Sequence, residues 1–327
     1  MKRYQIAGIG NAIVDVIATV DDLFLDHMGI RKGIMQLVER ERAEVLYGAM
    51  KDRAEASGGS VANTLAGVGR LGLRAAFVGR VNDDALGRFY ADDTSADFVN
   101  PPAANGELPT SRSMIFVTPD GERSMNTYLG ISAELGPEDV DADVMADSEI
   151  VFLEGYLFDK DKGKEAFLKA ARACRSTGGR AGIALSDPFC VDRHRADFRT
   201  LVANDMDYVI GNEQEWVALY QANDLDDALA QAARDCPLVV CTRSGDQVTI
   251  LAKGTRTEVP VTLVTPVDAT GAGDQFAAGF LYGLATGRDM GTAGRMGVIA
   301  AAEVISHIGA RPKSDIRAAF RRAGLVA

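Results

Sequence analysis

The sequence predicts an α/β protein with a mostly parallel central sheet and helices on both faces. The chain has 327 residues, of which 47% are hydrophobic, enough to bury a large core. Short apolar segments alternate with longer segments of helical periodicity, which is typical of parallel β-α-β units. The predicted strands are 4–9, 75–81, 150–154, 182–186, 208–211, 238–242 and 248–251. The predicted helices are 41–53, 60–71, 137–146, 162–176, 213–221, 226–234, 273–284, 289–308 and 313–323.

Two regions interrupt this alternation. The strand-like segment 14–20 directly follows another strand, and segments 111–117 and 123–129 flank a Pro-Asp-Gly turn that is typical of a hairpin. Neither region contains a crossover helix. We therefore expect a single domain over the whole chain, with a small β-lid formed by about residues 12–37 and 109–131.

Composition narrows the classes of partner. The formal net charge is −11, which argues against nucleic acids and anionic membranes. The four cysteines form no C-x-x-C pair and only three histidines are present, so we expect reduced thiols rather than zinc or disulfides. No apolar run is long enough for a signal peptide or a membrane helix. These features favour a cytoplasmic protein, monomeric or homodimeric, with a small-molecule substrate.

The most informative motif is Asp268-Ala-Thr-Gly-Ala-Gly-Asp274, which opens into an apolar helical pattern. Gly271 and Gly273 permit a tight turn and close approach of a ligand. Unpaired N–H groups and the helix dipole at this terminus favour an anion such as a transferring phosphoryl group. The dipole should keep Asp274 ionised, so that it can accept a proton from an attacking hydroxyl. A glycine turn with a capping aspartate would explain the same residues without catalysis.

Two N-terminal patterns are candidates for binding a polar acceptor. They are Gly10-Asn11-Ala-Ile-Val-Asp15 and Gly58-Gly59-Ser60-Val-Ala-Asn63. An asparagine offers both a donor and an acceptor, which suits a sugar diol. An ordinary helix start with a serine N-cap explains the second pattern equally well. The first pattern also has a simpler explanation, because Asp15 could be a charged residue on the exposed face of the lid.

Together these motifs resemble the ribokinase-like, or PfkB, family of carbohydrate and nucleoside kinases, and the likeness extends from Ile6 to Arg311. The resemblance implies a ribokinase-like fold and the use of ATP and Mg²⁺. It also implies that Asp274 is the catalytic base and that the preceding residues form an anion hole: Gly271, Ala272 and Gly273. The substrate-binding residues that it implies are Asn11, Asp15, Gly58, Gly59, Ser60 and Asn63.

The resemblance assigns further residues to the phosphate end. Asn212-Glu-Gln-Glu215 reads as a capping box, and the family's N-x-x-E motif adds a role in organising magnesium, with Glu215 acting through water. Arg123 on the lid hairpin is either a solvated side chain or a catalytic group that reaches the phosphate. Asp268 is a candidate ligand of a monovalent cation such as K⁺. The implied ATP contacts are Asn212, Thr242, Ser244, Gly245 and Thr270.

The acceptor is the least determined part of the prediction. The two N-terminal patterns look most like the adenosine kinase branch, and Val61 stands where sugar kinases of the family commonly have Gly, Ala or Pro. We therefore expect adenosine, with Leu37, Tyr156 and Phe158 as residues to inspect around the base. The alternatives are a sugar kinase acting on ribose, fructose or a keto-deoxy sugar, and a regulatory protein that binds a nucleoside or sugar. A dehydrogenase is disfavoured, because Gly8-Ile-Gly10 lacks the third glycine of a dinucleotide fingerprint.

Overall fold

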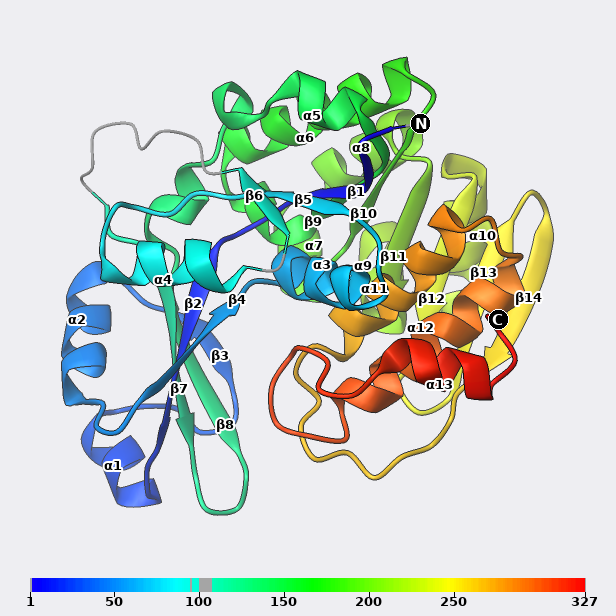
Figure 1. Ribbon diagram of the computed structural model, residues 1–327. Coiled ribbons are helices and arrows are strands. Elements are labelled where there is room, and N and C mark those ends of the chain that lie inside the picture. Colours follow the sequence, from blue (N-terminus) through cyan, green and yellow to red (C-terminus); the bar gives the residue numbers. More distant parts are fainter. Residues whose placement is uncertain (1, 95, 100–107, 327) are drawn as a thin grey trace.

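The computed structural model describes residues 2–94, 96–99 and 108–326 and contains two sheets (Figure 1). The larger sheet has the strand order β14-β13-β12-β11-β10-β9-β1-β5-β6. All its neighbouring pairs are parallel except β12–β13 and β13–β14. Its strands are β1 (Tyr4–Ile9), β5 (Ala75–Val78), β6 (Asp97–Val99), β9 (Ser148–Glu154), β10 (Arg180–Ala184), β11 (Tyr208–Asn212), β12 (Leu238–Thr242), β13 (Gln247–Ala252) and β14 (Thr255–Pro260).

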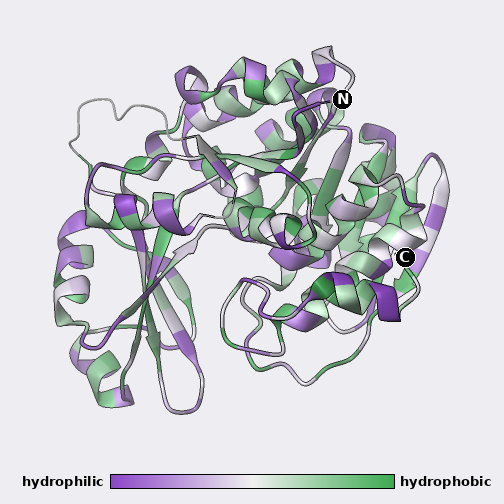
Figure 2. Ribbon diagram, in the orientation of Figure 1, coloured by the Kyte–Doolittle hydropathy of each residue, from purple (hydrophilic) through white to green (hydrophobic). Residues whose placement is uncertain are grey.

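Helices cover both faces of this sheet because side chains of successive strand residues point to opposite sides. In β9, Ile150 and Phe152 pack in a cluster with α3 and α11, whereas Val151 and Leu153 pack with α6 and α8 on the other face. Figure 2 shows the central strands in the green of apolar residues and the helices alternating between green and purple. The helices of the body are α3 (Ser60–Arg70), α4 (Ala85–Asp93), α5 (Ala142–Ala146), α6 (Asp161–Ser176), α7 (Pro188–Arg193), α8 (Arg195–Asp205), α9 (Glu213–Tyr220), α10 (Leu225–Asp235), α11 (Ala272–Ala285), α12 (Met290–Val304) and α13 (Ile316–Arg322).

The smaller sheet lies at the lower left of Figure 1 and has the strand order β3-β8-β7-β2-β4. It takes strands from both predicted lid regions and from a third segment, β4. α2 packs against β7 and β8. The elements of this region are β2 (Ile13–Thr19), α1 (Asp22–His27), β3 (Met35–Leu37), α2 (Arg40–Ala49), β4 (Ala54–Gly58), β7 (Ser111–Val117) and β8 (Arg123–Tyr128).

The predicted fold class is confirmed, with local differences. The segment 137–146 is a 3₁₀ turn (Pro137–Asp139) followed by the short α5, and not one helix. The sequence analysis missed α1, α4, α7 and α8. It also missed β4, whose sequence Ala-Glu-Ala-Ser-Gly has no β-branched or aromatic residue and is held in place by antiparallel pairing with β2. In the described part of the chain, no helix is long and apolar enough to cross a membrane.

Candidate active site

A cavity of about 860 Å³ lies where the small sheet meets the carboxyl ends of the parallel strands. Residues that directly follow or end β1, β9, β11 and β12 line it, namely Asn11, Glu154, Asn212 and Thr242. The carboxyl ends of parallel strands are the usual place for a ligand in an α/β sheet. The N-terminus of α11 closes one side of the cavity, and β2 and β3 of the small sheet line the other.

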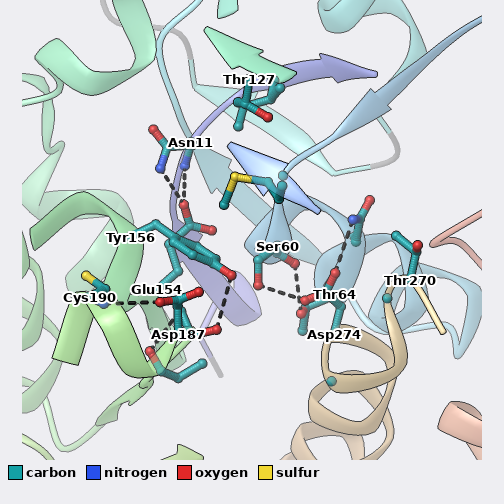
Figure 3. Close-up of a pocket in the computed structure, with 18 of the residues that line it drawn as sticks. Asn11, Ser60, Thr64, Thr127, Glu154, Tyr156, Asp187, Cys190, Thr270 and Asp274 are labelled. Atoms are coloured by element: carbon teal, nitrogen blue, oxygen red, sulfur yellow. Dashed lines mark hydrogen bonds between the residues drawn. The ribbon is translucent and has the colours of Figure 1, made fainter. Parts of the chain in front are cut away.

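Asp274 lies in the first turn of α11 and faces the N-terminus of α3 (Figure 3). Its Oδ1 accepts a hydrogen bond of 2.7 Å from Ser60 Oγ, and its Oδ2 accepts one of 3.1 Å from Asn63 Nδ2. Burial raises the pKa of Asp274, and these two hydrogen bonds oppose the rise. That the carboxyl is ionised, as expected from the helix dipole, stays a prediction. A carboxyl with a raised pKa suits a general base better, because its proton affinity is closer to that required near neutral pH.

The glycine turn before Asp274 leaves room for a ligand. Gly271 is the N-cap of α11 with φ of 80°, a left-handed conformation that favours glycine. A Cβ on Gly273 would meet open space, so nothing in the described structure fills that side of the turn. The backbone N–H of Ala272 donates to the carbonyl of Ala269 at 3.2 Å, whereas those of Gly271, Gly273 and Asp274 have no acceptor among the described residues. Of the three residues predicted to form an anion hole, Gly271 and Gly273 therefore have a free N–H and Ala272 does not.

Asp15 is the charged residue of the two N-terminal patterns that were predicted to bind an acceptor. It lies on β2 and lines the cavity, and its carboxylate has no hydrogen-bond partner within the described ranges. Burial raises its pKa to about 7; Arg123 and Arg311 act against the rise, and Asp274 adds to it. A largely desolvated carboxylate without a partner is costly unless a ligand supplies hydrogen-bond donors. The position therefore fits the recognition of hydroxyl groups.

Glu154 is a buried carboxylate of the site that the sequence analysis missed. It ends β9 and is 1% exposed. Its Oε1 accepts from the backbone N–H of Asn11 at 2.7 Å and from Asn11 Nδ2 at 2.9 Å, and its Oε2 accepts from the N–H of Val61 at 3.1 Å. It thus ties the end of β1 to the start of α3. The signal was present, since a glutamate ends an apolar parallel strand, but that pattern alone does not specify a role.

The predicted N-x-x-E motif forms a complete capping box. Asn212 Oδ1 accepts from the N–H of Glu215 at 2.9 Å, and Glu215 Oε2 accepts from the N–H of Asn212 at 2.7 Å. Glu215 Oε1 also accepts from Asn212 Nδ2 at 2.8 Å, so both of its oxygens already have protein donors. Burial raises the pKa of Glu215 to about 7. Both residues line the cavity, and this arrangement suits contact with a metal through water more than direct ligation.

Arg123 and Asp268 pair with each other across the gap between the small sheet and the body. Asp268 Oδ1 also accepts from the N–H of Thr270 at 3.0 Å, and its Oδ2 accepts from the N–H of Gly309 at 2.9 Å. Arg123 is therefore not a solvated hairpin arginine. The same pairing gives the Asp268 carboxylate a guanidinium and two amides as donors, and its role as a ligand of K⁺ stays a prediction.

Comparison with known proteins identifies the family. The model of the pfkB family carbohydrate kinases matches residues 9–317. This chain belongs to the PfkB family. A probable sugar kinase from Rhizobium etli is 46% identical over the full length of both chains, with a TM-score of 0.91. An adenosine kinase from Sinorhizobium meliloti is 45% identical, with 98% of this chain and 99% of that chain covered and a TM-score of 0.88. A 5-dehydro-2-deoxygluconokinase from Bacillus licheniformis is 29% identical over 76% of this chain and 80% of its own.

PfkB-family kinases use ATP and Mg²⁺, and the residues present fit both. The open space beside Gly273 and the unbonded amides at the start of α11 fit a phosphoryl group. The acidic groups nearby, Glu215 and Asp187, are both cavity-lining and carry the oxygen ligands that Mg²⁺ prefers, directly or through water. Asp187, the N-cap of α7, was missed by the sequence analysis.

Most of the predicted site residues line this one cavity of the kinase. The predicted residues that line it are Asn11, Asp15, Gly59, Ser60, Asn63, Asn212, Glu215, Thr242, Thr270, Gly271, Ala272, Gly273 and Asp274. Those outside its lining are Gly58, Arg123, Ser244, Gly245 and Asp268.

Of the three residues expected near a base, Leu37 and Tyr156 line the cavity and Phe158 does not. Phe158 is 1% exposed and stacks on Phe198 with ring centroids 4.0 Å apart, so it is a core residue. Two further apolar residues that line the cavity and are exposed, Met35 and Phe189, were missed. Nothing in the sequence around them distinguishes them from ordinary core positions.

Proposed function

We propose that this PfkB-family kinase transfers the γ-phosphoryl group of ATP to the 5′-hydroxymethyl group of a nucleoside, with adenosine as the acceptor. The observation that carries the proposal is a set of large apolar side chains at the cavity that remain exposed. Phe189 is 72% exposed, Leu37 53% and Met35 46%, and all three line the cavity. Exposed apolar groups around a cavity favour an acceptor with an apolar, flat part.

Asp274 is the proposed base. Its carboxylate oxygens already accept from Ser60 and Asn63, which fix the plane of the group while leaving further lone-pair positions for the acceptor hydroxyl. The hydroxyl donates its proton to Asp274 as it attacks. When bound, ATP would supply the phosphoryl group and leave as ADP, and Mg²⁺ held near Glu215 and Asp187 would neutralise the charge of the phosphates. The unbonded N–H groups of Gly273 and Asp274 lie at the positive end of α11, where they can stabilise negative charge.

Asp15 and Asn63 are the proposed contacts to the acceptor hydroxyls, and Glu154 holds the segments that present them. A ribose diol would supply the hydrogen-bond donors that the Asp15 carboxylate lacks within the described residues. Arg123 is proposed to exchange Asp268 for the phosphoryl group when the small sheet closes over the cavity.

A second candidate is a sugar kinase of the same family. The relatives favour both candidates to a similar degree, because a probable sugar kinase is 46% identical and an adenosine kinase 45%. The exposed apolar residues around the cavity support the nucleoside, since a free sugar would leave Phe189 in water. A binding protein without activity is disfavoured, because it needs no carboxylate next to a free helix terminus.

The test is a competition at equal concentrations of adenosine, ribose, fructose and 5-dehydro-2-deoxygluconate, with product formation followed separately for each. We expect adenosine to have the highest kcat/KM. A preference for any of the free sugars would refute the nucleoside assignment and leave the phosphotransferase assignment intact.

A further inference from the structure

A second cavity of about 720 Å³ lies behind the active site, at the C-terminal end of α3. Its volume is close to the 860 Å³ of the active-site cavity, so it can hold a ligand of similar size. Part of its wall is apolar. The lining residues are Ala56, Ala66, Gly69, Arg70, Leu73, Arg74, Ala75, Asp93, Asp97, Arg311 and Pro312.

The charges around this cavity favour an anion. The two aspartates have partners: Asp97 accepts from Tyr4 and pairs with Arg3 at 3.6 Å, and Asp93 accepts from Ser57. Two lining arginines, Arg70 and Arg74, are exposed and pair with no carboxylate in the described part of the chain. Guanidinium groups without a carboxylate bind phosphate well, because their paired N–H donors match its oxygens.

Arg311 connects the second cavity with the active site. Its Nη1 lies 3.4 Å from Asp93 Oδ2 in the second cavity, and its Nε donates to Asn63 Oδ1 at 3.4 Å. The other side of the Asn63 amide donates to Asp274 at 3.1 Å. The guanidinium thereby sets the orientation of the amide, with the oxygen toward Arg311 and the nitrogen toward the base. Its charge also lowers the pKa of Asp15.

We propose that the second cavity is a regulatory site for a phosphomonoester of about nucleotide size, whose binding weakens acceptor binding through Arg311. The phosphate binds Arg70 and Arg74 and competes with Asn63 for Arg311, while the apolar wall contacts the organic part. Once Arg311 turns toward the ligand, the Asn63 amide loses its fixed orientation and Asp15 loses a favourable charge. The proposal concerns a site distinct from the active site and does not depend on adenosine being the acceptor.

Binding is tested by calorimetric titration of the full chain with AMP and with ribose 5-phosphate, with adenosine as the uncharged probe. The matched proteins are wild type, the double variant Arg70→Glu/Arg74→Glu, and Arg288→Glu as a control that reverses an exposed charge outside the cavity. We expect the double variant to lose one class of phosphomonoester sites, with affinity reduced about tenfold or more, and to keep adenosine binding. Arg288→Glu should match wild type. Equal phosphomonoester affinity in all three proteins would overturn the site.

Coupling is tested by measuring the acceptor KM with and without ribose 5-phosphate, using whichever acceptor the enzyme phosphorylates. We expect ribose 5-phosphate to raise the KM of wild type, and to raise that of the double variant markedly less. The kcat and KM without ligand should be equal in the two proteins. An identical rise in both would mean that ribose 5-phosphate acts only in the active site, and would overturn the regulatory role. Circular dichroism of both variants verifies that they are folded.

Discussion

The two ends of the active-site cavity are built in different ways. The phosphate end is one continuous loop and helix start, from Asp268 to Asp274, whose own backbone creates the binding groups. The acceptor end is assembled from β2, β3, α3, α7 and the end of β9, which are distant in the sequence. In the function that we propose, residues of the first end act through backbone amides and one carboxylate, whereas those of the second act through side chains that hold one another. Substitutions at the two ends should therefore differ in the size and in the kind of their effects on activity.

The largest effect is expected for Asp274→Asn. The amide cannot accept the proton of the attacking hydroxyl, so kcat should fall by about 10²–10⁴. Nucleotide affinity should change little, because the shape and the hydrogen-bond acceptor at Oδ1 are kept. Steady-state kinetics and nucleotide titration measure the two quantities. A kcat close to that of wild type would remove Asp274 from the proton transfer.

Gly273→Val should rank second. Because a Cβ there meets open space, the protein should tolerate the side chain, which would project where the phosphoryl group is expected to bind. Loss of anion stabilisation should reduce kcat by about 10²–10³ with little change in the thermal midpoint. The control is Gly48→Val on α2, where a Cβ would also meet open space. Gly287 is unsuited as a control position, because its φ of 68° would strain a valine. Equal kinetics in Gly273→Val and Gly48→Val would contradict a phosphate-binding turn.

This difference between the two ends also explains what the sequence could predict. The Asp268–Asp274 loop could be predicted as a phosphate-binding site because the proposed binding groups lie in consecutive residues, and the parallel sheet could be predicted because apolar strands alternate with helices. Glu154 and Phe189 were not predicted as site residues, because their place in the site depends on which distant segments they contact. The ion pair of Arg123 with Asp268 likewise joins β8 of the small sheet to the loop before α11, which no local pattern reveals.

At the acceptor end, Asp15 should make binding depend on pH. Burial raises its pKa to about 7, so the carboxylate is largely protonated below pH 7 and ionised above it. Only the ionised form offers both oxygens as acceptors to hydroxyl groups. The acceptor KM should therefore fall as the pH rises through about 7, and Asp15→Asn should abolish this fall and raise the KM by about 5- to 150-fold, from about 1–3 kcal/mol.

The raised pKa of Asp15 has the opposite effect on stability: acceptor binding should improve as the pH rises, whereas the free energy of unfolding should fall. A carboxyl whose pKa is raised in the folded state contributes stability that is full below its ordinary pKa of about 3.9 and is lost progressively as the pH rises through about 7. Without acceptor, urea denaturation should thus show a lower free energy of unfolding above pH 7 than below it, and a smaller difference in Asp15→Asn. Glu154 and Glu215, whose pKa values burial also raises to about 7, should contribute to the remainder. An unchanged pH profile of KM in Asp15→Asn would assign the titration to another group.

The smallest expected effect, and the one that discriminates best between acceptors, is that of Phe189→Ala. The ring is 72% exposed and lies at the start of α7, so its removal should leave the thermal midpoint unchanged. If the ring contacts the base, the loss of an aromatic contact of about 0.5–1.5 kcal/mol should lower kcat/KM for adenosine by about two- to twelvefold, mainly through KM. The kcat/KM for ribose, which has no base, should not change. Leu23→Ala is the matched control, because Leu23 is 75% exposed on α1 and outside the cavity lining. Equal losses for adenosine and ribose would show that Phe189 serves the cavity as a whole, and would withdraw the main support for a nucleoside acceptor.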